Sequence, residues 1–177
     1  APGYDADILL RWGDALFPDS PDFDPANQTE ASQLRQFGYN NDFIGMIPLS
    51  ADRAALCINH EYTNEELMFP GLGNQEKKDF ADMSPALVGV EMAAHGGTIV
   101  EIARGSNGKW AVDRNGALNR RITASTPMRL SGPAAGHARM QTQADPNGTT
   151  VLGTINNCAG GITPWGTYLM AEENFNG

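Results

Sequence analysis

Apolar and polar residues alternate over short runs along much of the chain, which is the pattern of half-buried β-strands. The clearest runs are residues 40–49 (NNDFIGMIPL), 54–63 (AALCINHEYT), 148–160 (GTTVLGTINNCAG) and 166–175 (GTYLMAEENF). Turn-forming residues separate such runs about every 8–12 residues, and the chain contains 20 glycines. We therefore predict an all-β fold, for which a sandwich and a β-propeller fit the spacing equally well.

Helical periodicity is confined to short segments, at residues 29–37, 63–68 and 84–94. The last of these competes with a second interpretation. Residues 87–104 hold two apolar stretches on either side of Gly96-Gly97, a pair that would suit the turn of a β-hairpin. A few short helices are thus expected beside the strands, and a further short strand is expected within residues 105–116.

The N-terminal part of the chain shows neither periodicity. Its stretch FPDSPDFDPANQ, residues 17–28, contains three prolines and is typical of a loop that wraps a surface. We predict an irregular N-terminal segment over residues 1–34. A β-domain follows over residues 35–177, and we expect it to be incomplete at its C-terminus because an acidic pair lies so close to the last residue.

Composition narrows the classes of function. The chain has 177 residues, 41% of them hydrophobic and 19% charged, as is typical of one globular domain. No apolar run approaches the roughly 20 residues that cross a bilayer. The net charge of −9 repels nucleic acid and anionic membranes, so neither is an expected partner. An anionic substrate would need a metal or a few arginines to attract it.

The chain has two cysteines, Cys57 and Cys158. Their separation excludes a C-x-x-C zinc or redox motif. They could form one disulfide or remain two separate thiols. Cys57 lies in an apolar run, so we interpret it as a core residue.

Acidic residues near strand ends are candidate metal ligands. Glu61 follows a predicted strand in the stretch INHEYTNEE, and Glu172 and Glu173 follow another, close to Cys158. A thiolate suits softer transition metals, whereas carboxylates suit calcium or ferric iron. The alternative is that these glutamates are solvent-exposed charges at strand ends. Only one of two adjacent glutamates can face inward unless the strand twists, ends or bulges there.

A second candidate group lies in LNRRIT, residues 118–123. Asn119, Arg120 and Arg121 could clamp a phosphate or a carboxylate. Adjacent arginines are also common as plain surface charge. The small-residue loop SGPAAGH, residues 131–137, lacks the lysine of a Walker motif.

Four blocks in this order resemble the PhoX-type alkaline phosphatases: NHEYT, NRRIT, SGPAAGH and NNCAGGITPWGTYLMAEENF. The resemblance covers roughly residues 35–177. It implies a large β-propeller, of which this chain would be the first blades. It also implies a bacterial phosphomonoesterase that is exported by the twin-arginine pathway to the periplasm or medium.

The resemblance further implies a mixed cluster of ferric iron (Fe3+) and calcium (Ca2+). Carried over by position, Cys158 is the iron-binding thiolate and Glu61, Glu172 and Glu173 are cluster carboxylates. Asn119, Arg120 and Arg121 would contact phosphate.

The remaining C-terminal part of the propeller would supply further ligands, so the chain should pair with it and be inactive alone. Two alternatives stay open. One is a non-catalytic propeller segment with structural calcium, and the other is a propeller hydrolase of another ester or a phosphodiester.

Overall fold

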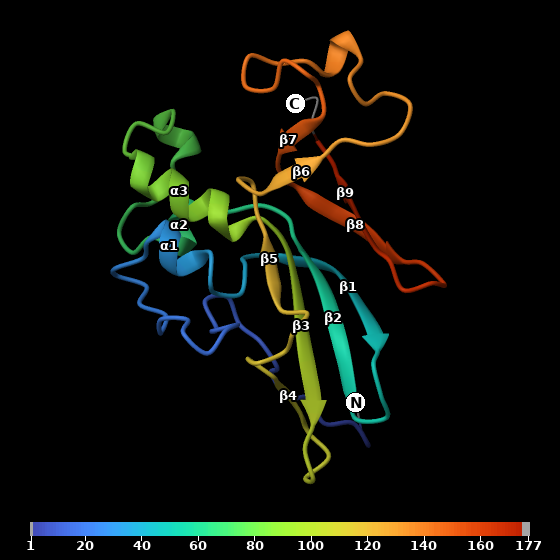
Figure 1. Cartoon of the computed structure of the whole chain (residues 1–177). Coiled ribbons are helices and arrows are strands. Elements are labelled where there is room, and N and C mark those ends of the chain that lie inside the picture. The colour runs from blue at the N-terminus through green and yellow to red at the C-terminus, as the bar shows by residue number, and fades with distance from the viewer. Residues whose placement is uncertain (1, 175–177) are drawn as a thin grey trace.

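The computed structural model describes residues 2–174, and a five-stranded antiparallel sheet lies at its centre (Figure 1). Its strands are β1 (Asn41–Pro48), β2 (Arg53–His60), β3 (Gly96–Arg104), β4 (Trp110–Val112) and β5 (Arg120–Ile122). The long strands follow the order β1-β2-β3, and both β4 and β5 pair with β3, at opposite ends of it.

Two smaller antiparallel pairs follow in the sequence. Strand β6 (Pro127–Arg129) pairs with β7 (Thr150–Leu152), and β8 (Asn157–Ile162) pairs with β9 (Tyr168–Glu172). The helices are short: α1 (Glu30–Gln33), α2 (Glu65–Met68) and α3 (Pro85–Ala94), with 3-10 turns at Glu76–Lys78 and Ala138–Met140. The predicted all-β class with a few short helices is therefore confirmed. Over the described residues, no helix is long and apolar enough to cross a membrane.

The hairpin predicted around Gly96-Gly97 is wrong, because its first apolar stretch is helix α3. The Ser84 side chain caps this helix by accepting a hydrogen bond from the amide of Leu87, and Pro85 fits the first turn. Gly96 then enters β3 with φ of +94°, and an added Cβ would lie 2.1 Å from the Ile122 carbonyl oxygen. The glycine pair thus permits a close approach of β3 and β5 rather than a turn.

The single strand predicted over residues 148–160 is also wrong, because it divides into β7 and β8. Asn156 adopts φ of +50°, a left-handed conformation that interrupts a strand. The predicted strand at 166–175 is confirmed as β9, although Phe175 lies outside the described residues. Neither β5 nor β6 was expected from the sequence.

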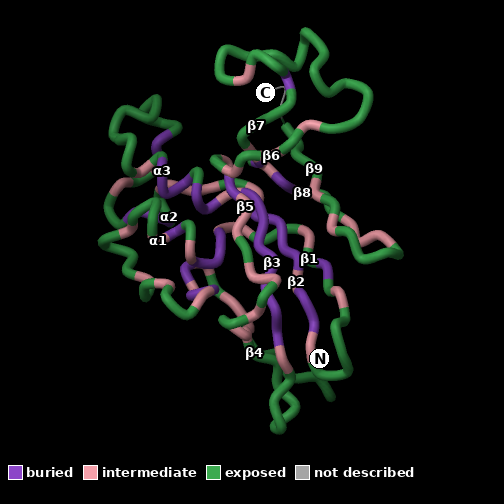
Figure 2. Tube along the Cα trace, in the orientation of Figure 1, coloured by how far each residue is buried: buried purple, intermediate pink, exposed green. Residues whose placement is uncertain are grey.

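The core lies over β2, β3 and α3, where most residues are buried (Figure 2). One cluster joins Leu16 of the N-terminal segment to Phe37, Ile58 and Val100. Residues 1–34 thus contribute a fully buried side chain to the core, as a wrapping segment would. The division of the chain at residue 34 stays a prediction.

The β8–β9 hairpin packs on β1 by close backbone approach. A Cβ on Gly160 would lie 2.5 Å from the Phe43 ring, and one on Gly45 would lie 2.8 Å from Ile162. The rings of Phe43 and Tyr168 also stack, with centroids 6.1 Å apart. Glycines at these positions bring β8 down onto the central sheet, and this contact creates the site described next.

Candidate metal centre

One half of the site forms where β1 begins and β2 ends. Asn41 pairs with His60, but the register shifts between Asn41 and Ile44, which marks a bulge around Asp42. The amide of Glu61 donates to the Asn40 carbonyl over 3.0 Å. A bulge redirects side chains at a strand end, so Asp42 and Glu61 come to lie beside one another.

The other half forms where β8 begins. Its register with β9 shifts between Asn157 and Gly160, so a second irregularity surrounds Cys158. The Glu173 amide donates to the Asn156 carbonyl over 2.9 Å, which holds the chain after β9 against the start of β8. Cys158 and Glu173 therefore share one end of the hairpin.

These two strand ends meet. Ligand atoms of Asp42, Glu61 and Cys158 all lie within 4.8 Å of one another. Glu173 also lies next to this group, because its carboxylate influences both Glu61 and Cys158. The structure thus brings together three of the residues predicted from the sequence, namely Glu61, Cys158 and Glu173, and adds Asp42.

The electrostatics of this group are unfavourable without a cation. The pKa of the Cys158 thiol is raised to about 12, first by its hydrogen bond to Asp42, then by lost hydration and the charges of Asp42 and Glu173. Burial raises the pKa of Glu61, and Asp42 and Glu173 raise it further. The nearby carboxylates thus make Glu61 and the Cys158 thiol harder to ionise.

Such a donor set fits a metal ion. Carboxylate oxygens are ligands for hard cations, and a thiolate adds affinity for a transition metal. A cation would stabilise the ionised forms of Glu61 and Cys158, which their neighbours disfavour. The separation of the ligand atoms is also short enough for a single ion to contact several of them.

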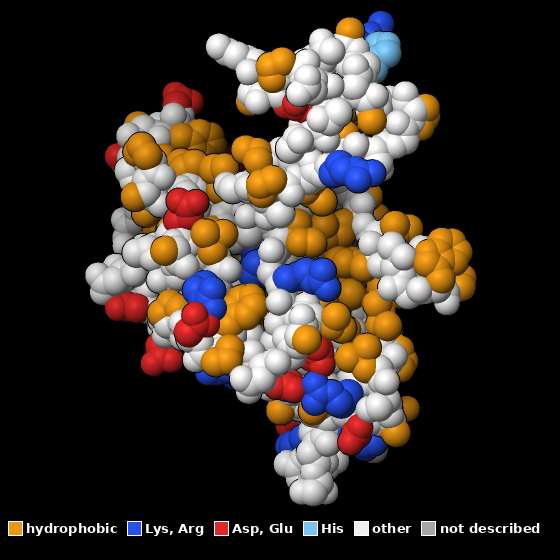
Figure 3. Space-filling view, in the orientation of Figure 1, with side chains coloured by type: hydrophobic (Ala, Val, Ile, Leu, Met, Phe, Trp, Pro, Cys, Tyr) orange, Lys and Arg blue, Asp and Glu red, His pale blue; other side chains and the backbone are white. Residues whose placement is uncertain are grey.

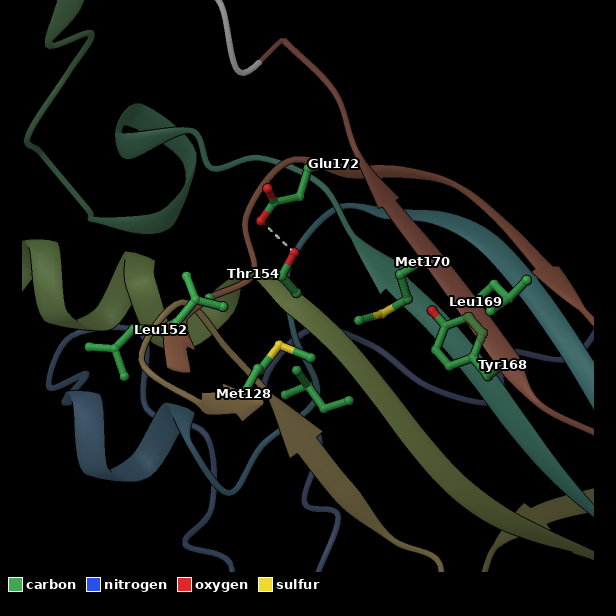
Figure 4. A pocket seen from close by; sticks show the side chains of 10 residues that line it. Met128, Leu152, Thr154, Tyr168, Leu169, Met170 and Glu172 are labelled. Carbon is green, nitrogen blue, oxygen red and sulfur yellow. Dashed lines mark hydrogen bonds between the residues drawn. The ribbon is translucent and has the colours of Figure 1, made fainter. Parts of the chain in front are cut away.

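Glu172, the fourth predicted ligand, lies outside this group. Its Oε1 accepts from the Thr154 hydroxyl over 2.6 Å and from the Ile155 amide over 3.1 Å. It faces a cavity of about 570 Å³ that Met128 and Met170 also line (Figure 4). In this structure Glu172 holds the turn between β7 and β8, so its role as a ligand stays a prediction.

The three predicted phosphate contacts make bonds to the protein itself. Asn119 Nδ2 donates to the carbonyls of Leu16 and Asp113, and its Oδ1 accepts from the Glu101 amide. Arg120 Nε donates to the Leu118 carbonyl, and the residue is exposed.

Arg121 has its guanidinium withdrawn from solvent. It donates to the carbonyls of Gly97, Ala93 and His95 and to the Thr98 hydroxyl, over 2.7–2.9 Å. Burial lowers the pKa of Arg121 to about 9. Contact of Asn119, Arg120 or Arg121 with phosphate stays a prediction.

The alternation of side chains along β2 determines which residues of NHE face the core and which face the site. His60 is fully buried, packs edge-on against Phe37, and pairs its Nε2 with the Thr98 hydroxyl over 2.7 Å. Asn59 and Glu61 point to the opposite face, toward β8, because successive side chains of a strand alternate. Among the residues of NHE, therefore, the histidine belongs to the core and the glutamate to the site.

Asp42 was missed by the sequence analysis. Its only signal is that it is the one carboxylate in a largely apolar run. In the structure it follows Asn41, which pairs with His60 at the end of β2. Of the two alternatives considered for the cysteines, the structure has separate thiols, because Cys57 and Cys158 are both free. Cys57 is buried among Ala55 and Ile99, as expected for a core residue.

A family model described as alkaline phosphatase PhoX matches residues 1–177. The chain belongs to the PhoX family of alkaline phosphatases. The match begins well before residue 35, so the N-terminal segment belongs to the PhoX family pattern as well. The predicted resemblance is thereby confirmed and extended.

A solved structure agrees with this assignment. It is the PhoX of Pseudomonas fluorescens in complex with vanadate, a transition state analogue, and it is 42% identical to this chain with a TM-score of 0.88. The match covers 98% of this chain but 29% of the Pseudomonas chain. Our chain therefore corresponds to part of a propeller-type PhoX fold. No match was found among curated proteins.

Proposed function

We propose that this chain forms part of a metal-dependent phosphomonoesterase, which releases inorganic phosphate from organic phosphoesters. The observation that carries the proposal is the convergence of Asp42, Glu61 and Cys158 in a PhoX family member. The vanadate named with the Pseudomonas relative also supports phosphoryl transfer, because transition-state analogues bind where the reaction occurs.

In this proposal Asp42, Glu61 and Cys158 hold the cations, with Glu173 at the edge of the group. The thiolate favours iron as Fe3+, and the carboxylates favour Fe3+ and Ca2+. Bound cations would neutralise charge on the phosphoryl oxygens, which is most of what phosphoryl transfer requires of a protein. The protein residues orient these ions, and Cys158 must release its proton before it can serve as a ligand.

For the phosphate itself, we propose Arg120 as the first of the three candidates to test. Its side chain is exposed, whereas Asn119 and Arg121 would have to break several bonds to backbone atoms before reaching a substrate. Guanidinium groups bind phosphate oxygens in pairs, so one free arginine can contribute a specific contact.

We propose that the remaining C-terminal part of the propeller covers the apolar face beside the β8–β9 hairpin. Hydrophobic side chains gather there in view of solvent (Figure 3). Ile47, Ile122 and Tyr168 line a cavity of about 410 Å³, and Leu152 and Leu169 are more than half exposed. A patch of this kind on a monomer marks an interface. We therefore expect the chain to be inactive without that part.

We also propose, from the family resemblance, a periplasmic or secreted location reached through twin-arginine export. Fractionation of the native host would test it, with the activity expected outside the cytoplasm. Activity confined to the cytoplasm would overturn this part of the proposal alone.

The decisive experiment measures iron, calcium and phosphatase activity in the full-length protein and in two matched variants. Cys158→Ala should lose iron and activity toward p-nitrophenyl phosphate. Cys57→Ala removes the other thiol, which lies in the apolar core, and should keep both. Retention of iron and activity by Cys158→Ala would refute the assignment. Calcium without iron in the unaltered protein would instead favour a structural module.

A further inference from the structure

A partly buried hydrogen-bond group joins the end of β2, next to Glu61, to the strand that carries Cys158. Its centre is Asn59, which has no exposed surface. Asn59 Nδ2 donates to the Cys158 carbonyl over 2.8 Å and to the Ala159 carbonyl over 3.0 Å. The Tyr168 hydroxyl bonds to Asn59 Oδ1. All the polar atoms of the Asn59 side chain are thus used.

The chemistry of the partners fixes the roles within this group. Carbonyl oxygens only accept hydrogen bonds, so the amide nitrogen of Asn59 must face Cys158 and Ala159. Its oxygen is then left for Tyr168, whose phenol must donate. Burial raises the pKa of Tyr168 well above its ordinary value, which keeps that donor protonated.

The location of these bonds coincides with the bulge in β8. Within the described hairpin, Asn157 pairs with Glu172 and Gly160 pairs with Met170, while Cys158 and Ala159 lie between without a register partner on β9. Asn59 supplies their carbonyls with donors from the central sheet. Because these bonds give both carbonyls a donor where β9 offers no register partner, the contact favours the bulged form of the strand.

Tyr168 connects the same group to the other carboxylate strand. Its ring stacks on Phe43 at an interplanar angle of 17°, and Phe43 directly follows Asp42. Asn59 lies two residues before Glu61, on the same face of β2. The backbone around all three convergent side chains is therefore tied to one Asn–Tyr pair.

We propose that Asn59 and Tyr168 are positioning residues, which set the distance between the Cys158 thiol and the carboxylates of Asp42 and Glu61. Neither residue is a ligand. The inference rests on the proposed function, because positioning matters only if the group binds a metal. Loss of such supporting bonds typically weakens metal binding by about 10–100-fold.

The test uses isosteric variants of the full-length protein, stripped of metal and titrated with cobalt(II). Binding of cobalt by a thiolate produces a charge-transfer absorption band, which reports Cys158 directly. Asn59→Asp replaces the donor with an acceptor that faces two carbonyls, so we expect metal binding about 10–100-fold weaker and a reduced band. Tyr168→Phe removes only the hydroxyl and should reduce the band by a smaller factor.

The matched control is Tyr39→Phe, which removes the hydrogen bond between the Tyr39 hydroxyl and Asn64 Oδ1, 3.2 Å long and away from β8. This control should keep the band and the affinity of the unaltered protein. Circular dichroism shows whether each variant is folded, and if Asn59→Asp fails to fold, Tyr168→Phe decides.

The possible outcomes separate the two proposals. If the unaltered protein gives no thiolate band, the proposed metal function fails. If it gives the band, and folded Asn59→Asp and Tyr168→Phe keep the same band and affinity, the positioning role is overturned while the metal function stands. A loss of stability without any change in the band would likewise show that the pair is only structural.

Discussion

Glu91 provides a test of the burial argument that does not depend on the metal centre. It lies on α3 with 9% of its surface exposed, and its Oε1 has no hydrogen-bond partner among the described residues. Burial raises the pKa of Glu91 to about 7, the Thr63 side chain opposes this, and the nearby Glu65 adds to it.

Ionisation of Glu91 lowers the stability of the folded protein, because the folded state holds the Glu91 proton to a higher pH than the unfolded state does. An unfolded chain releases it near the ordinary value of 4.5, whereas the folded protein holds it until pH reaches about 7. The contribution of Glu91 to stability is therefore fully present below pH 4.5 and is lost as pH rises through 7. Since each pKa unit corresponds to about 1.4 kcal/mol, the loss cannot exceed about 3.5 kcal/mol. Water at the edge of the helix should reduce it to about 1–3 kcal/mol.

Glu91→Gln removes the ionisation and keeps the shape. Its amide can accept from Thr63 and donate to Glu65. We expect a free energy of unfolding close to that of the unaltered protein at pH 5, and about 1–3 kcal/mol greater at pH 8. The assay is urea unfolding followed by tryptophan fluorescence, with a chelator present at each pH. Glu66→Gln, on the exposed side of α2, is the matched control and should show no such change.

The refuting result is simple to recognise. If the difference between Glu91→Gln and the unaltered protein is the same at pH 5 and pH 8, Glu91 does not hold its proton in the folded protein. The lack of hydration inferred from its burial would then be wrong.

Three further predictions concern the site and its supports. Gly160→Ala should destabilise the protein by about 1–3 kcal/mol and lower its metal content, because the new Cβ would lie 2.5 Å from the Phe43 ring; thermal unfolding and elemental analysis measure both. Metal affinity should rise about tenfold per pH unit between pH 6 and 9, because the Cys158 thiol, whose pKa is about 12, must lose its proton on binding. Calorimetry in two buffers would detect the released proton. An affinity that does not change with pH would exclude the thiolate as a ligand. Arg121→Lys should lower stability by about 2–4 kcal/mol in denaturant unfolding, even without phosphate, because a lysine cannot replace the four bonds that Arg121 donates; an unchanged midpoint would contradict this.

Strand periodicity located the elements that build the site but not how they meet. The run at residues 40–49 predicts β1 and the run at 166–175 predicts β9 because each alternates over several residues. By contrast, β5 and β6 have three residues each, too few for a period to show. Strand β4 is equally short, but the glycines and polar residues on both sides of it indicate its position. The left-handed Asn156 that separates β7 from β8 likewise leaves no mark on the hydrophobic pattern.

Site residues could be predicted from the sequence when they lie in a distinctive motif, but not when only tertiary packing brings them to the site. Glu61 and Cys158 stand in distinctive blocks, NHEYT and NNCAGG, and they do converge. Asp42 joins them through a bulge and through glycines that let β8 approach β1, which are properties of the three-dimensional contact. The buried hydrogen bonds of Arg121 also depend on α3 turning back toward β5, which no spacing along the chain indicates.

The contact between the central sheet and the β8–β9 hairpin affects the order in which parts of the protein unfold. Asn59 and Cys158 are 99 residues apart in the sequence. An ion shared by Glu61 and Cys158 would act as a cross-link, and closing a loop of about a hundred residues removes chain entropy equivalent to roughly 4–5 kcal/mol from the unfolded state. Chelation should therefore release this hairpin first, with faster amide hydrogen exchange in β8 and β9 while β2 and β3 stay protected.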